Sequence, residues 1–250
     1  MDGTDLNHTT FGRSDVVAFY VDQQDLLPEE EHLFGRYVPP GLDILDLGIG
    51  AGRTTPALAA GARRYVGLDY VPAMIEAAGR LHPDEEFVVG DASDLSSFAD
   101  GSFDAVVFSF NGLDCLPTVE GRVRCIAECR RVLRPGGVFI MSSHNPRAVL
   151  GRAVVAGSGP VAALKRLVAL AWGTVRRAVV RMPQRAFWTG EGYLYERTHG
   201  GLRLYAALPS RLERDVSAHG FCLEERVPST HPATRSPFGT AWYYYAFRAI

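Results

Sequence analysis

The stretch ILDLGIGAGRT, residues 44–54, decides the fold. It joins a short apolar run to a glycine-rich turn, and a helical pattern follows directly. Glycines let the backbone approach a ligand closely, and a helix N-terminus presents unpaired N–H groups. This is the nucleotide-facing position of a doubly wound α/β fold. A nicotinamide-binding fingerprint would place glycine where Arg53 stands, so the spacing disfavours a dinucleotide-dependent oxidoreductase.

Apolar runs rich in β-branched and aromatic residues continue from this stretch and alternate with helical patterns. Because the runs are continuous rather than alternating, we expect strands buried on both faces of a parallel sheet. Pro135 and the glycines after it should end a helix and turn the chain into the next strand. The expected strands are 43–47, 64–69, 86–91, 103–110 and 137–143, and the expected helices lie near 53–61, 72–82 and 119–133.

A different pattern begins after residue 145. Residues 147–185 contain eight Lys or Arg and no acid, and 159–180 has the apolar and basic spacing of a helix. Two strands, within 187–198 and 202–208, should flank His199 as a hairpin. A helix over 208–220 and strands over 221–227 and 241–250 then complete the core. The prediction is therefore an N-terminal helix and Rossmann-like core (1–145), an inserted module (146–207) and the C-terminal part of the core (208–250).

The composition suits one α/β domain with an insertion. The chain has 250 residues, 47% of them hydrophobic and 22% charged, and a formal net charge of −2, which argues against a dedicated nucleic-acid binder. The polar N-terminus lacks the apolar run of a signal peptide, which predicts a cytoplasmic protein. Cys125 and Cys129 have helical spacing, but no second ligand pair accompanies them, so we expect core packing and no metal.

Three acids stand where strands of such a fold end. Asp46, two residues before the first glycine, is suited to hold an amino-acid ammonium, which a dinucleotide lacks. Asp69 ends the second strand, where a carboxylate can accept both ribose hydroxyls. Asp91 can accept from an adenine amino group, and a simple helix N-cap is the alternative for it.

Five segments occur in a characteristic order: LDLGIGAGRTT, VGLDYVPAMIEAA, VVGDASDL, FDAVVFSFNGLDCL and RVLRPGGVFIMSSHN. Together they resemble the class I methyltransferases that use S-adenosylmethionine (SAM), closely over residues 40–145 and loosely over 208–250. The resemblance implies a seven-stranded doubly wound sheet in the order 3-2-1-4-5-7-6 with the last strand antiparallel. It also implies SAM as methyl donor and S-adenosylhomocysteine (SAH) as product.

The resemblance assigns roles to individual positions. The first two glycines of the turn would touch the methionyl part of SAM, and the residues at the end of the second strand would bind the ribose. The segments after the second and third strands would contact the adenine. Phe110 and Asn111 would close the pocket beside the sulfonium, and Tyr20 would cover the cofactor from an N-terminal helix. The full set predicted to bind the cofactor is Tyr20, Asp46, Gly48, Gly50, Gly52, Arg53, Asp69, Tyr70, Met74, Asp91, Ala92, Phe110 and Asn111.

The acceptor is expected to be a small molecule methylated on O or N, with C as a further option, such as a natural product or an anionic sugar- or lipid-like metabolite. A hydroxyl or protonated amine must lose a proton, and histidine is the usual base near neutral pH. His144, at the carboxyl edge of the sheet, and Asp114, after the fourth strand, are the candidate catalytic residues. His199 and His231 would reach the site only if their loops fold over it.

The insertion is expected to form a lid over the acceptor. Its basic and apolar faces would suit an anionic or lipid-like acceptor or an anionic membrane surface, but a solvated lid or a homodimer surface is the favoured interpretation. Its aromatic residues, Trp172 and Trp188 among them, could line an acceptor pocket. An RNA or protein methyltransferase and a non-catalytic SAM-binding regulator remain as alternatives. The first is weakened because Asn111 precedes Gly112 rather than a proline.

Overall fold

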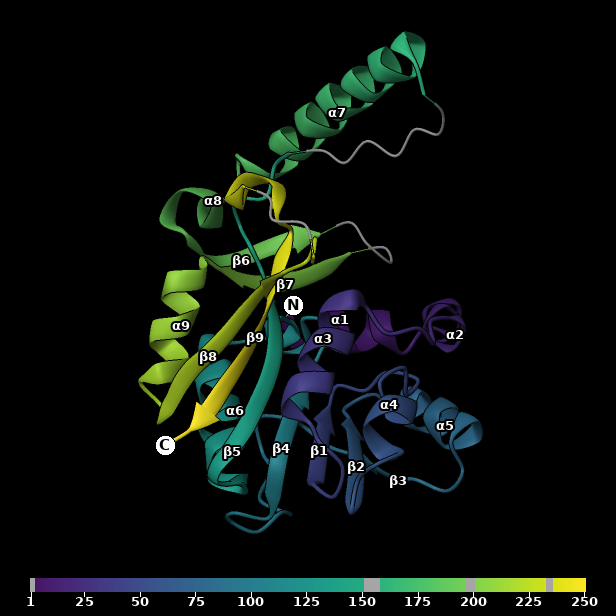
Figure 1. The fold of residues 1–250 in the computed structure, drawn as a ribbon, viewed down its shortest axis with the longest axis vertical. Coiled ribbons are helices and arrows are strands. Elements are labelled where there is room, and N and C mark those ends of the chain that lie inside the picture. Colours follow the sequence, from purple (N-terminus) through teal and green to yellow (C-terminus); the bar gives the residue numbers. More distant parts are fainter. Residues whose placement is uncertain (1–2, 151–157, 197–200, 233–235) are drawn as a thin grey trace.

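The computed structural model describes residues 3–150, 158–196, 201–232 and 236–250. A central sheet carries helices on both faces (Figure 1). Its first five strands run parallel in the order β3-β2-β1-β4-β5, as predicted. They are β1 (Asp43–Leu47), β2 (Arg64–Asp69), β3 (Glu86–Val89), β4 (Phe103–Phe108) and β5 (Leu133–His144).

Two C-terminal strands extend the sheet beyond β5. β9 (Trp242–Ala249) lies antiparallel between β5 and β8 (Phe221–Pro228). When the core strands alone are numbered, β8 is the sixth and β9 the seventh, so the predicted order 3-2-1-4-5-7-6 and the antiparallel last strand are confirmed.

The insertion adds strands that the seven-strand prediction did not include. β6 (Glu191–Glu196) and β7 (Leu202–Ala207) form the expected antiparallel hairpin. Ala206 of β7 pairs with His144 at the end of β5, so the described part of the sheet has nine strands. The hairpin therefore continues the core sheet instead of forming a separate layer.

The predicted start of the fifth strand is wrong, and β3 and β4 end two residues before their predicted ends, at Val89 and Phe108. Helix α6 (Val119–Val132) ends before the Leu-Arg-Pro-Gly-Gly segment, but that segment belongs to β5 and does not precede it. Leu133 already pairs with Phe103, and regular pairing resumes at Val138 after an irregularity. Gly136, at φ 77°, supplies the bend within the strand.

The helices pack on the two faces of the sheet. The single N-terminal helix expected around Tyr20 is two helices, because Leu27 is extended and Pro28 starts a new one. Cys125 and Cys129 of α6 are buried in the core, as expected. The helices flanking the core strands are α3 (Pro28–Tyr37), α4 (Thr55–Ala59), α5 (Pro72–Leu81), α6 and α9 (Pro209–Ser217). Helix α1 (Gly3–Phe11) contacts β7, and α2 (Ser14–Asp22) contacts α1 and α5.

The insertion also supplies α7 (Pro160–Arg181) and α8 (Arg185–Thr189). Figure 1 shows α7 projecting away from the sheet, beyond the hairpin. Across the described ranges, no helix is both long enough and apolar enough to cross a membrane.

Candidate functional site

A cavity of about 190 Å³ lies at the carboxyl ends of β1, β2 and β4, the edge where open α/β sheets bind ligands. Residues of the glycine-rich turn form its floor, and α1 and α2 contribute one aromatic side chain each. Its lining is Phe11, Tyr20, Asp46, Leu47, Gly48, Ile49, Gly50, Arg53, Thr54, Leu68, Asp69, Tyr70, Met74, Gly90, Asp91, Ala92, Phe108, Ser109, Phe110, Gly112, Cys115, Leu116 and Pro117.

The turn after β1 requires glycine for steric reasons. Gly48 has φ 61°, and a Cβ added there would lie 2.7 Å from Phe108 Cε2. Gly50 has φ 57°, and its missing side chain leaves room for the ring of Tyr20. Left-handed backbone without a Cβ lets the main chain itself form the cavity surface, while the N–H groups of Gly48 and Gly50 donate to Leu68 O and Asp69 Oδ2.

Asp69 is anchored to this turn. Its Oδ2 accepts from Gly50 N at 2.9 Å, and its Oδ1 accepts from Val71 N at 2.9 Å. Burial raises the pKa of Asp69 to about 6, although these two N–H groups oppose the shift. Each carboxylate oxygen keeps a further lone pair, so the side chain can accept two hydroxyl donors from a ligand.

Asp46 offers an acceptor that the protein leaves unused. Its Oδ2 accepts from Thr54 Oγ1 at 2.6 Å and Tyr65 OH at 2.9 Å. Its Oδ1 is buried and has no partner in the described part of the chain. Burial raises the pKa of Asp46 to about 7. Because a buried polar atom without a partner is costly, this oxygen fits a ligand that brings an ammonium or another donor.

The residues predicted to surround an adenosine also reach the cavity. Met74 and Ala92 are buried in its wall, and the Tyr70 hydroxyl is buried without a partner in the described residues. Asp91 lines the cavity from an exposed position, and its Oδ1 accepts from Ser93 N at 2.8 Å. No helix directly follows Asp91 in the described structure, so the helix N-cap interpretation is wrong, and its contact with Ser93 N is that of a local turn at the cavity border.

Two of the predicted cofactor residues do not line the cavity. Gly52, at φ 86°, supports the turn, since a Cβ there would lie 2.8 Å from His82 Cδ2. Asn111 follows Phe110, and both have positive φ, 51° for Phe110 and 63° for Asn111. The Asn111 N–H donates to Ser142 Oγ at 2.6 Å, which fixes this strained turn beside the cavity.

Arg53 lines the cavity, but its charge is held by an acid that the sequence analysis missed. Its Nη1 and Nη2 lie 2.5 and 2.6 Å from the two carboxylate oxygens of Glu30, which is fully buried on α3. Ser109 and Tyr244 also donate to Glu30. The Arg53 guanidinium lies over the Phe110 ring, 5.1 Å from its centroid. Nothing in the local sequence, Pro-Glu-Glu-Glu, distinguishes Glu30 from its neighbours.

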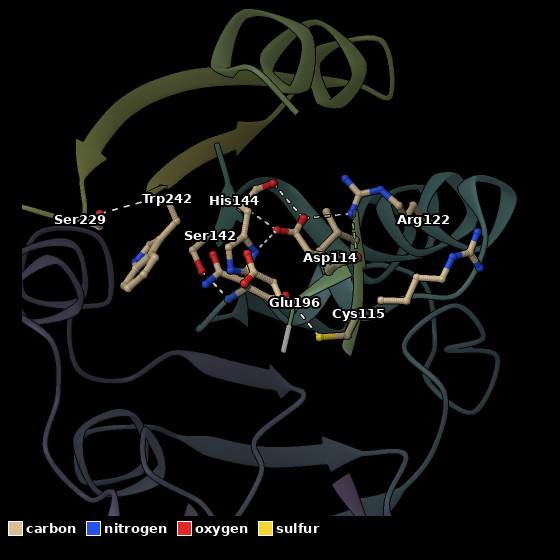
Figure 2. Close-up of polar contacts among 12 residues, drawn as sticks. Asp114, Cys115, Arg122, Ser142, His144, Glu196, Ser229 and Trp242 are labelled. Carbon is tan, nitrogen blue, oxygen red and sulfur yellow. Dashed lines mark hydrogen bonds and ion pairs between the residues drawn. The ribbon is translucent and has the colours of Figure 1, made fainter. Parts of the chain in front are cut away.

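His144 and Asp114, predicted separately, are hydrogen-bonded partners (Figure 2). His144 Nδ1 lies 2.8 Å from Asp114 Oδ2, which also accepts from His144 N at 2.7 Å. Arg122 and Ser143 donate to Oδ1. Asp114 is fully buried, whereas the His144 side chain is partly exposed.

Neither residue of this pair is part of the cavity lining. Asp114 nevertheless lies between Gly112 and Cys115, which do line it. The pair therefore borders the cavity through one short 3-10 helix (Gly112–Cys115).

Two further histidines were predicted to reach the site only if their loops fold over it. His199 falls outside the described residues. The ring of His231 packs against the ring of His32, with 4.7 Å between the ring centroids. Trp172 and Trp188 are exposed, and no described residue of the insertion lines the cavity. The sequence analysis also missed several apolar wall residues, because burial against a ligand and burial in a core give the same pattern; they include Phe11, Ile49, Phe108, Leu116 and Pro117.

Part of the chain is similar to known proteins. A family model described as a methyltransferase domain matches residues 45–141. A demethylmenaquinone methyltransferase of Beutenbergia cavernae is 41% identical over 106 residues, 42% of this chain and 42% of that protein. A ubiquinone biosynthesis O-methyltransferase of Xanthomonas campestris is 30% identical over 139 residues, 54% of this chain and 56% of that protein. The matches thus span about half the length of these relatives.

A crystal structure of a SAM-dependent methyltransferase from Methanosarcina mazei has the same fold, with a TM-score of 0.64 and 20% sequence identity. The superposition covers 90% of this chain and 99% of that one.

Proposed function

We propose that the chain is a SAM-dependent methyltransferase acting on a small molecule, because residues 45–141 match the family model of a methyltransferase domain and the fold is Rossmann-like. The observation that carries this proposal is the pair of buried carboxylates, Asp46 and Asp69, on either side of one glycine turn in one cavity. A dinucleotide has hydroxyls for Asp69 but no ammonium for Asp46.

The cavity residues would hold SAM by its three parts. Asp69 accepts the ribose hydroxyls, Asp46 accepts from the ammonium, and Met74 with Ala92 packs against the adenine. SAM supplies a methyl group on a sulfonium, which is a good leaving group. The task of the protein is then to hold an acceptor atom in line with that methyl group, about 3 Å away, and to exclude water.

The acceptor atom that best fits the neighbouring groups is a hydroxyl oxygen, with nitrogen and carbon as other outcomes. Asp114 accepts from His144 Nδ1, which leaves Nε2 free to take a proton. Phe11, Phe110 and Pro117 add apolar surface to the cavity. Two of the relatives are named for quinone metabolism, so we infer a flat, largely apolar ring compound as the acceptor class.

The first experiment measures SAH binding by calorimetry and then screens phenolic and quinol acceptors for SAM-dependent mass gain. Binding followed by turnover supports the proposal. Binding without turnover on small molecules, RNA or protein would favour a regulatory SAM-binding protein, and turnover on RNA or protein alone would replace the small-molecule acceptor. We place the reaction in the cytoplasm, and we retain a homodimer as part of the proposal.

His144 is tested by the substitution His144→Gln. We expect kcat to fall by about 10²- to 10⁴-fold, the usual contribution of general base catalysis, with SAH affinity unchanged. Asp114→Asn should lower kcat and shift the pH–rate profile, because Asp114 acts by positioning His144. The matched control is His231→Gln, which removes a histidine packed against His32 and should leave kcat unchanged. Wild-type kcat in His144→Gln would exclude the base role.

SAH affinity should rise with pH between 5.5 and 7.5. Burial raises the pKa of Asp46 to about 7 and that of Asp69 to about 6, so in acid the ligand-free protein carries protons on the groups that must accept. Binding then releases protons, and affinity gains roughly tenfold per pH unit for each coupled proton.

Calorimetry in buffers of different ionisation enthalpy measures this proton release. 5′-Methylthioadenosine lacks the ammonium. Its affinity should therefore still change with pH near pH 6, where Asp69 titrates, but no longer near pH 7, where Asp46 titrates. An SAH affinity that does not change from pH 5.5 to 8.5 would contradict the roles assigned to Asp46 and Asp69.

A further inference from the structure

Helix α7 is the longest helix of the described structure. It has 22 residues, none of them buried. Near its C-terminal end, Arg177 donates to Leu150 O at 2.8 Å and Arg181 pairs with Glu196. Figure 1 shows the helix extending from this attachment away from the sheet.

One face of α7 is a continuous apolar stripe. Its six members follow one another at intervals of three or four residues, the spacing of a single helix face. Each is between 56% and 70% exposed, which is far more than an amphipathic helix packed on a core would leave. The stripe consists of Val161, Leu164, Val168, Trp172, Val175 and Val179.

The charges beside this stripe have one sign. Lys165 and Arg176 lie at one edge of it, next to Trp172, and both are exposed. Arg166, Arg177 and Arg181 lie on the other side of the helix, and the helix contains no acid. A partner that binds this surface must therefore have both an apolar region and negative charges.

The apolar stripe and the positive charges together distinguish between the possible binding partners of α7. A second copy of the helix would offer apolar side chains but would bring like charges together, which is unfavourable. A nucleic acid would meet the charges but leave the apolar stripe in water. A bilayer with anionic headgroups satisfies both faces, because a basic amphipathic helix lies in the interface with its apolar face among the acyl chains.

We propose that α7 docks the protein on an anionic lipid surface, with the stripe inserted and the cations among the headgroups. This inference is independent of the methyl transfer proposed above, since it needs neither cofactor nor acceptor. Trp172 sits at the centre of the stripe, as expected for a residue that favours the interfacial region.

The experiment is flotation of the full chain with vesicles of phosphatidylcholine alone or with phosphatidylglycerol added. We expect binding to the anionic vesicles, with a partition coefficient that falls at least about tenfold for Lys165→Glu combined with Arg176→Glu, and likewise for Val168→Ser combined with Trp172→Ser. The matched control, Arg80→Glu with Arg124→Glu, makes the same charge change on exposed residues of α5 and α6 and should bind nearly as wild type.

A second readout reports the stripe directly. Anionic vesicles should shift the tryptophan emission to shorter wavelength, and Trp172→Phe should remove the shift while binding persists. Equal binding to neutral vesicles, or an equal loss in the control variant, would overturn the proposal. So would a concentration-dependent dimer, without vesicle binding, that the Val168→Ser and Trp172→Ser pair abolishes. SAH affinity, measured on the same variants, separates a failure here from a failure of the methyltransferase proposal.

Discussion

Replacing Asp69 with alanine should weaken SAH binding at least about 100-fold. The carboxylate is expected to accept both ribose hydroxyls, and hydrogen bonds to a charged acceptor are worth about 1.5 kcal/mol or more each. Two of them come to about 3 kcal/mol, and about 1.4 kcal/mol is tenfold in Kd. Asp69 also accepts from Gly50 N and Val71 N, so the substitution loosens the turn on which the ligand rests.

Calorimetry on folded protein measures this effect, and thermal unfolding monitors the fold. Asp91→Ala is the matched control, because it removes a carboxylate from the same cavity edge at an exposed position. Its loss of affinity should stay below about tenfold, the worth of one exposed hydrogen bond. A similar affinity for Asp69→Ala and the wild type would remove the basis for the cofactor assignment.

Arg53→Ala should lower the free energy of unfolding by about 3–5 kcal/mol, the usual cost of leaving a buried charge without its partner. Glu30 is fully buried, and burial alone would raise its pKa, but Arg53 holds the pKa below its ordinary value. Removing the guanidinium leaves an anion among Ser109 and Tyr244, whose hydroxyls do not neutralise it.

Urea unfolding at pH 7.5 measures this loss. Glu30→Gln combined with Arg53→Met should recover most of it, because replacing both members of a buried pair removes the unpaired charge. Arg64→Ala breaks a pair that is exposed on both sides and should cost less than about 1 kcal/mol. An Arg53→Ala variant as stable as Arg64→Ala would show that the Glu30 pair contributes little to the fold.

The sheet and the cavity at its carboxyl edge could be predicted because both depend on short, local sequence patterns. β1 and β2 begin and end where their apolar runs do, and the glycine turn lies between β1 and α4 by chain order alone. Asp46 and Asp69 follow from their positions at strand ends. The bend at Gly136 was misplaced because a proline–glycine pair reads as a turn whether it lies before a strand or inside one.

Long-range pairings could not be predicted in the same way. Glu30 and Arg53 lie 23 residues apart, and only the packing of α3 against the turn brings them together. His144 and Asp114 were each identified by strand position, yet their hydrogen bond depends on how the segment after β4 folds against the end of β5. The insertion's hairpin was expected, but its pairing with β5 through Ala206 has no signature in the local sequence.

The separation between the cavity and the insertion has an evolutionary consequence. Every described residue of the cavity lining comes from positions 11–117, whereas the insertion begins after the last residue of β5. The hairpin nevertheless contacts this lining, because Tyr193 OH donates to Leu116 O and Arg203 donates to Pro117 O. Helix α7 lies outside these contacts in Figure 1, so selection can alter or exchange α7 while the cavity is retained. Lineages that share residues 40–145 should accordingly diverge faster in α7 than in the hairpin of β6 and β7.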